Sequence, residues 1–142
     1  MSDNLLTNAD ESGVYHLVTS RRTSIESAAL HAKFCVLKAD ITRPATTDAV
    51  LRQLGSALNF PSWYGDNFDA LHDCLTDPDW APAKGHVLFI NGLAGLRASA
   101  PDDFAILIDV FQSAAETRRA KHTPFWVLLD APARGIQTLA EA

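Results

Sequence analysis

The 142-residue chain has few of the residues that would indicate a disulfide scaffold, a secretory leader or a membrane span. It contains two cysteines, Cys35 and Cys74, which we expect to be free thiols in a reducing compartment. No apolar run approaches the roughly 18–20 residues that cross a bilayer, and residues 1–12 lack the apolar segment of a signal peptide. We therefore expect a cytoplasmic protein that does not contact membranes, with a disordered tail over residues 1–12.

Motifs of common catalytic sites are also missing. The sequence has no glycine-rich phosphate loop, no nucleophile elbow and no cysteine ligand set. Asp69, His72 and Asp73 could share one helical face and ligate a metal, which leaves a metal-dependent hydrolase as a distant alternative. One helix rarely completes such a site, and the other histidines show no ligand pairing. We expect a protein that is not an enzyme and that needs neither metal nor cofactor.

Lysine and arginine are absent from residues 59–80, which read NFPSWYGDNFDALHDCLTDPDW. The whole chain has 17 acidic and 12 basic residues, a net charge of −5, and this stretch alone holds five aspartates. Such a concentration of negative charge predicts a cationic partner and argues against direct binding of nucleic acid, whose phosphates it would repel. The five are Asp66, Asp69, Asp73, Asp77 and Asp79.

The same stretch predicts a short amphipathic helix from Asn67 onward. A solvated acidic face is the simpler interpretation. However, Asp69–Asp73 and Asp73–Asp77 are like-charge pairs four residues apart, each costing about 0.2–0.5 kcal/mol, and no nearby basic residue offsets them. This repulsion favours a recognition surface. The expected apolar face is Phe68, Leu71, Cys74 and Leu75, and the acidic face is Asp66, Asp69, Asp73 and Asp77, flanked by His72 and Thr76.

A loop with two large aromatic residues, Trp63 and Tyr64, precedes this helix. Aromatic side chains beside charges are typical of interface hot spots, and we expect one of the two to pack in the core instead. Asp66 is expected to cap the helix in a capping box with Asp69, and Gly65 to permit the turn before it.

Residues 61–76 read Pro-x-Trp-Tyr-Gly-Asp-Asn-Phe-Asp-Ala-Leu-x-Asp-Cys-Leu-Thr, which resembles the signature of the barstar-like family. The family consists of intracellular inhibitors of barnase-type (guanyl-specific) ribonucleases. The resemblance implies an inhibitor that blocks a cationic active site with its acidic helix and aromatic loop, and it matches Trp63, Asp69 and Asp73 to contact positions, with Asp73 reaching deepest. The expected partner-binding residues are Trp63, Tyr64, Gly65, Asp66, Asp69, His72, Asp73 and Thr76.

Two positions depart from the best-known member of that family. It has a tryptophan where this chain has His72, and a contacting glutamate where this chain has Ser113. Glu116, one helical turn further on, could supply the missing acid. An alternative therefore stays open, in which the chain is an immunity or regulatory protein that binds a different basic nuclease or toxin domain. In either case we expect a monomer when it is free.

Apolar runs that alternate with helical patterns predict an α/β domain, with a small parallel sheet of three to four strands packed with helices, as in the barstar-like fold. We expect Ser24 to cap a helix over residues 25–32. Arg118, Arg119 and Lys121 are assigned to the C-terminal dipole of their own long helix. The expected divisions are a tail over 1–12, an N-terminal extension of a strand and a short helix over 13–33 that packs on the domain, a barstar-like domain over 34–131, and a C-terminal tail over 132–142.

Overall fold

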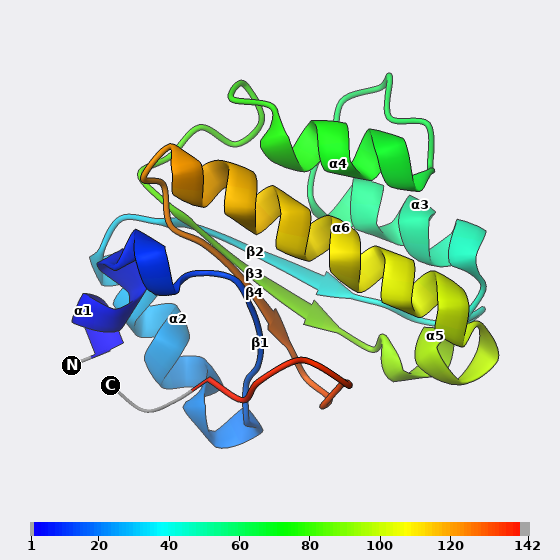
Figure 1. Cartoon of the computed structure of the whole chain (residues 1–142), viewed down its shortest axis with the longest axis horizontal. Coiled ribbons are helices and arrows are strands. Elements are labelled where there is room, and N and C mark those ends of the chain that lie inside the picture. The colour runs from blue at the N-terminus through cyan, green and yellow to red at the C-terminus, as the bar shows by residue number, and fades with distance from the viewer. Residues whose placement is uncertain (1, 140–142) are drawn as a thin grey trace.

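Four parallel strands form the central sheet of the computed structural model, which describes residues 2–139 (Figure 1). The strand order is β1-β4-β3-β2, and every neighbouring pair is parallel. The two central strands are mostly apolar and almost wholly buried, as expected of parallel strands covered on both faces. The predicted α/β fold with a small parallel sheet is confirmed. The strands are β1 (Val14–His16), β2 (Cys35–Asp40), β3 (His86–Asn91) and β4 (Phe125–Leu129).

Helices cover both faces of this sheet (Figure 1). The first two lie on one face and the other four on the opposite face. Among the described residues, no helix is both long and apolar enough to cross a membrane. The helices are α1 (Ser2–Thr7), α2 (Arg22–His31), α3 (Thr47–Ala57), α4 (Phe68–Thr76), α5 (Ala94–Ser99) and α6 (Pro101–Ala120), with 3-10 turns η1 (Ala9–Glu11) and η2 (Thr19–Arg21).

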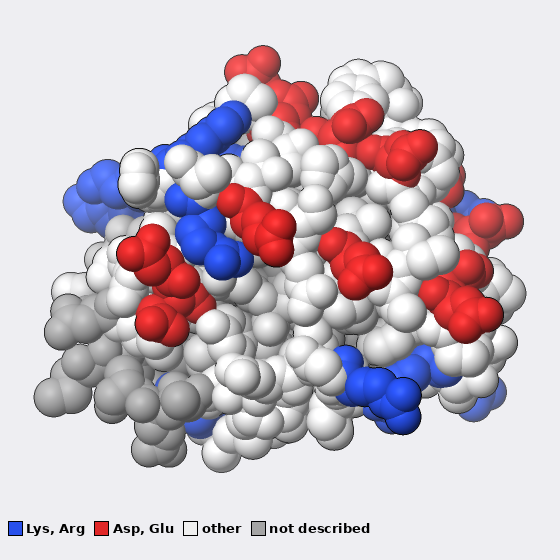
Figure 2. Space-filling model, in the orientation of Figure 1, with Lys and Arg blue, Asp and Glu red and all other residues white. Residues whose placement is uncertain are grey.

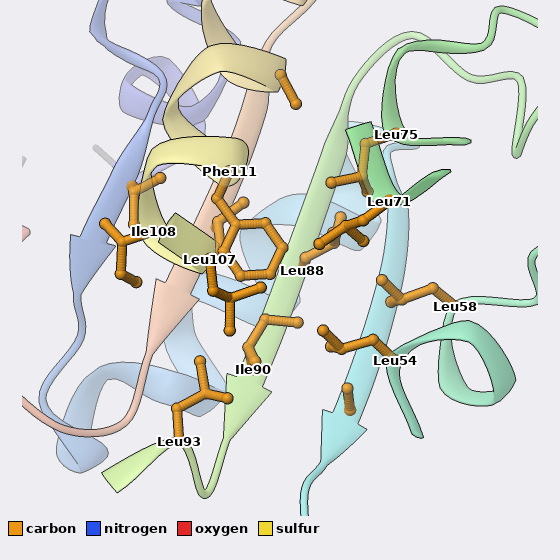
Figure 3. Close-up of a cluster of buried hydrophobic side chains, with 14 of the residues drawn as sticks. Leu54, Leu58, Leu71, Leu75, Leu88, Ile90, Leu93, Leu107, Ile108 and Phe111 are labelled. Atoms are coloured by element: carbon orange, nitrogen blue, oxygen red, sulfur yellow. The ribbon is translucent and has the colours of Figure 1, made fainter. Parts of the chain in front are cut away.

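Alternate side chains of β3 enter two separate hydrophobic clusters. Leu88 points toward α4 and α6, where it lies between Leu71 and Phe111 (Figure 3). Val87 and Phe89 point to the other face and pack with residues of α1 and α2. The buried side chains of α4 therefore pack in one cluster with those of α6 and the sheet.

Residues 2–11 form two short helical elements, whereas the sequence led us to expect a disordered tail over residues 1–12. Ser2–Thr7 form α1, and Ala9–Glu11 form η1. Leu6 is fully buried, and its carbonyl accepts a hydrogen bond from the indole Nε1 of Trp126 at 3.0 Å. A buried indole N–H needs an acceptor, and this long-range contact joins the segment to β4. Residue 1 lies outside the described residues.

Part of the region expected to form a C-terminal tail, residues 132–142, also packs on the sheet. The amide of His16 donates to the carbonyl of Gln137, and the amide of Leu139 donates to the carbonyl of His16, both at 2.8 Å. Leu139 is buried. The segment therefore satisfies backbone groups at the free edge of β1. Residues 140–142 lie outside the described part of the chain.

The front of the chain differs from the sequence prediction in where its helix begins. β1 precedes α2 and β2 follows it, and the two strands occupy opposite edges of the sheet. The helix α2 begins at Arg22 and not after Ser24, because η2 continues directly into it and the amide of Arg22 bonds to the carbonyl of Thr19. Ser24 therefore lies inside the helix and is not its cap.

Candidate partner-binding surface

The helix α4 presents an acidic face to solvent and buries the opposite face. Leu71, Cys74 and Leu75 are fully buried, whereas Asp69 and Asp73 are exposed. The predicted amphipathic pattern is confirmed for these residues, whereas Asp66 precedes α4 and the half-buried Asp77 follows it. Because the buried leucines pack against the sheet and α6, the two carboxylates are held on a fixed support.

Cys74, on the buried face of α4, is a free thiol, and so is Cys35, as the sequence predicts. Burial raises the pKa of Cys74 to about 11, and the nearby carboxylates of Asp73 and Asp77 contribute to this shift. The thiol is therefore protonated at neutral pH, a state in which it is a poor nucleophile.

The N-terminus of α4 is capped by Asn67 and not by Asp66. The side-chain oxygen of Asn67 accepts a hydrogen bond from the amide of Ala70 at 2.7 Å. Asp66 instead adopts a left-handed conformation with φ of 54°, which aspartate tolerates better than most residues. Gly65 has no positive φ, so the residue that makes the turn is Asp66.

The C-terminus of α4 is capped by Arg118 of α6. The guanidinium donates to the carbonyl of Leu75 from Nε at 3.1 Å and from Nη2 at 2.8 Å, and Nη2 also reaches the carbonyl of Asp77 at 3.1 Å. Burial lowers the pKa of Arg118, and the Asp77 carboxylate opposes that shift. The sequence assigned Arg118 to the dipole of its own helix, but its hydrogen bonds serve the end of α4.

The guanidinium of Arg118 also lies over two aromatic rings, 6.0 Å from the centroid of Trp80 and 5.8 Å from that of Phe125. Arg118 is only 8% exposed. A cation at this end of α4 interacts favourably with the negative pole of the helix dipole. It also partly offsets the like-charge repulsion along the acidic face. The sequence did not predict a basic residue at the C-terminal end of α4.

The loop before α4 turns one aromatic ring inward and the other outward. The hydroxyl of Tyr64 donates to the carbonyl of Leu51 in α3 at 2.8 Å, and its ring lies against Gly55 and Phe60. Burial raises the pKa of Tyr64. Trp63 is 55% exposed. The expectation that one of the two rings packs inward is confirmed, and Tyr64 is the one that does.

Two other predicted site residues make contacts within the domain. The Nε2 atom of His72 lies 3.1 Å from the hydroxyl of Ser113 on α6. The hydroxyl of Thr76 donates to the carbonyl of His72 at 2.8 Å. His72 thus links α4 to α6 at the margin of the acidic face. Glu116 is exposed and lines a different cavity, which it shares with Asp10 and Tyr15.

Acidic side chains gather over α4 and along α6 on the face shown in Figure 2. Asp69, His72 and Asp73 do not assemble into a metal site: within residues 2–139, no three histidine, cysteine or carboxylate side chains are grouped so that they could hold a metal ion.

The fold and this surface define a small parallel α/β domain that presents a capped acidic helix. A family model described as "Barstar (barnase inhibitor)" matches residues 34–130, more than half of the chain. The chain therefore belongs to the barstar family, whose members are inhibitors of ribonucleases. A search of curated proteins finds no match. The matched region contains α4 and α6 but not α1, β1 or α2, so one strand of the sheet lies outside it.

Proposed function

We propose that the protein inhibits a barnase-type (guanyl-specific) ribonuclease by placing the carboxylates of α4 in its cationic active site. An enzyme that cleaves RNA presents basic side chains to the phosphates of its substrate, and carboxylates can take the place of those phosphates. Asp69 and Asp73 would make these contacts, with Asp73 at the centre. Trp63 would add an aromatic anchor from the loop that precedes α4.

One observation carries this proposal: the acidic helix is held in place against its own repulsion. Asn67 caps its first turn, Arg118 caps its last, and its apolar face is buried. A surface that is ordered before binding loses less conformational entropy when the partner arrives, which favours tight binding. The barstar family match supports the same function.

The other predicted site residues have supporting roles in this proposal. Tyr64 would fix the loop that carries Trp63, and Asp66 would set its turn into α4, next to Gly65. Thr76 and His72 would border the contact. In this role the protein acts without catalysis, metal or cofactor, as a monomer in the cytoplasm when free, and it binds neither nucleic acid nor membrane.

A second candidate is an immunity or regulatory protein for a different basic nuclease or toxin domain. The hydrogen-bonded pair of His72 and Ser113 favours it. The best-known family member has a tryptophan and a glutamate at these two positions. The border of the acidic face therefore differs between the two proteins in side-chain size and in charge.

The test is titration of the protein into an RNA-cleavage assay of a barnase-type ribonuclease. We expect stoichiometric inhibition by the wild type and its loss in Asp69→Asn/Asp73→Asn. The matched control is Asp102→Asn/Asp109→Asn, which removes the same charge from exposed positions on α6 and should still inhibit. Undisturbed cleavage in the presence of the wild type would contradict this target and leave the second candidate.

A further inference from the structure

A cavity of about 350 Å³ opens beside the exposed indole of Trp63. It lies between the loop that precedes α4 and the loop that follows it, so Trp63 stands near the C-terminal end of the helix. Its lining combines two indoles with two carboxylates and contains no lysine or arginine. The residues that matter here are Asn59, Pro61, Trp63, Asp77, Asp79 and Trp80.

One wall of the cavity is rigid. The indole Nε1 of Trp80 donates to the carbonyl of Leu58 at 2.8 Å, and the ring stacks on His86 with centroids 5.6 Å apart. Trp80 is buried, so this wall belongs to the core. Trp63 also lines the cavity and is 55% exposed, so it is available to a partner.

The two carboxylates of the cavity differ in how they are used. The Oδ1 atom of Asp77 accepts a hydrogen bond from the amide of Asp79 at 2.9 Å, and Asp77 is half-buried near Arg118. Asp79 is exposed. The carboxylate of Asp79 is therefore the better placed of the two to bind a group that enters from solvent.

An arginine side chain matches this chemistry better than other groups. Its guanidinium is planar, stacks on an indole and pairs with a carboxylate through two parallel hydrogen bonds. A lysine ammonium is more strongly hydrated and has no flat face to stack. An acidic group would be repelled, and an apolar group would remove water from the carboxylates without pairing them.

We propose that this cavity receives an arginine side chain of the target protein. The contact lies at the C-terminal end of α4, where the cavity is lined by Asp77 but by neither Asp69 nor Asp73. It adds a second cationic contact to the one with the active site. The proposal rests on the proposed function, since both require a basic target. It assigns to Asp79 and Trp63 the selection of targets that carry an arginine at the edge of their interface.

The first test uses the whole protein and a small probe, so that it does not depend on the ribonuclease. Nα-acetyl-arginine amide is titrated while the Trp63 indole resonance is followed by NMR, with the citrulline analogue as the uncharged control. We expect the arginine probe alone to shift this resonance. Asp79→Asn should weaken its binding about two- to five-fold, and Asp102→Asn/Asp109→Asn, which removes two exposed charges from α6, should leave it unchanged. Equal shifts with citrulline, or undiminished binding of the arginine probe by Asp79→Asn, would overturn the proposal.

A second test separates this proposal from the proposed function. If the wild type fails to inhibit the ribonuclease but its indole still responds to the arginine probe in an Asp79-dependent way, the target is wrong and the arginine cavity stands. If it inhibits and the probe leaves the indole unshifted, the cavity proposal is wrong while the inhibitor function stands.

Discussion

The imidazole of His72 on α4 and the hydroxyl of Ser113 on α6 are joined by a hydrogen bond of 3.1 Å, 41 residues apart in the chain. Both residues differ from the best-known member of the barstar family, and they contact one another. A small polar pair therefore replaces a large ring and a carboxylate at the border of the acidic face. The two departures are one local change and not two independent ones.

Restoring an acid at this border should speed association with a basic ribonuclease. Ser113→Glu adds a carboxylate next to His72, and we expect a higher association rate at low salt because the added charge steers the encounter. Salt should remove most of the gain, since exposed charges are screened. Stopped-flow kinetics at two ionic strengths measures this, with Ser113→Gln as the control of equal size. Equal rates for Glu and Gln would contradict the prediction.

Removal of the Arg118 guanidinium should destabilise the protein. Arg118→Met keeps much of the apolar stem but leaves the carbonyls of Leu75 and Asp77 without their donor. Hydrogen bonds to charged groups contribute about 1.5–3 kcal/mol, so we expect a loss of that order in the free energy of unfolding from urea titration. Lys121→Met, an exposed cation at the end of the same helix, is the control and should cost less than about 0.5 kcal/mol. Similar losses in both variants would argue against the capping role.

The position of the aromatic loop can be tested through Gly55 and Tyr64. A Cβ atom at Gly55 would lie 2.5 Å from Cε2 of Tyr64, so Gly55→Ala must displace the ring or the helix. We expect Gly55→Ala to lower the free energy of unfolding by about 1–3 kcal/mol in the wild type. In a Tyr64→Ala background the same change should be neutral or stabilising, because alanine favours a helix over glycine by about 1 kcal/mol.

Chemical denaturation of the four proteins in this double-mutant cycle gives the coupling between the two sites. If the changes in the free energy of unfolding are additive, the absence of a side chain at Gly55 is not what allows the Tyr64 ring to pack there. If the two changes are not additive and the variants also bind the ribonuclease more weakly, the packing of Tyr64 against α3 helps to position Trp63.

Local patterns in the sequence predicted the parts of this site that depend on nearby residues. The helical spacing of Leu71 and Leu75 predicted which face of α4 is buried. The alternation of apolar runs with helical patterns predicted a parallel sheet. The family signature lies within this locally determined stretch. The capping residue was assigned one position too early, to Asp66, because both Asp66 and Asn67 are good capping residues and only the backbone conformation distinguishes them.

Contacts between distant residues could not be predicted in the same way. Arg118 is 41 residues from Asp77, and its position near the end of α6 had a sufficient local explanation. Leu6 and Trp126 are 120 residues apart, and a polar N-terminal segment gives no sign that one leucine will be buried. The cavity beside Trp63 likewise depends on two loops that meet only in the folded chain.

Stability should fall as the pH drops below about 6.5, and His86 should account for part of that fall. His86 is fully buried, and its Nε2 lies 2.6 Å from the carbonyl of Ala81. Burial lowers the pKa of its imidazole; the hydrogen bond to Ala81 partly opposes this shift, and the charge of Arg118 adds to it. Between the lowered folded-state pKa and the ordinary value near 6.5, the unfolded chain therefore binds a proton that the folded protein does not.

This difference in proton binding sets the sign of the effect. The free energy of unfolding holds its full value above the unfolded-state pKa and decreases as the pH falls through that window, by at most about 1.4 kcal/mol per pH unit for one proton. Urea titrations at pH 7.5, 6.5 and 5.5 measure it, with His86→Gln as the comparison, because glutamine can still donate to Ala81 but does not titrate. The variant should lose less stability over this range than the wild type. Equal losses would assign the pH dependence to other groups, since the remaining histidines and carboxylates are the same in both proteins.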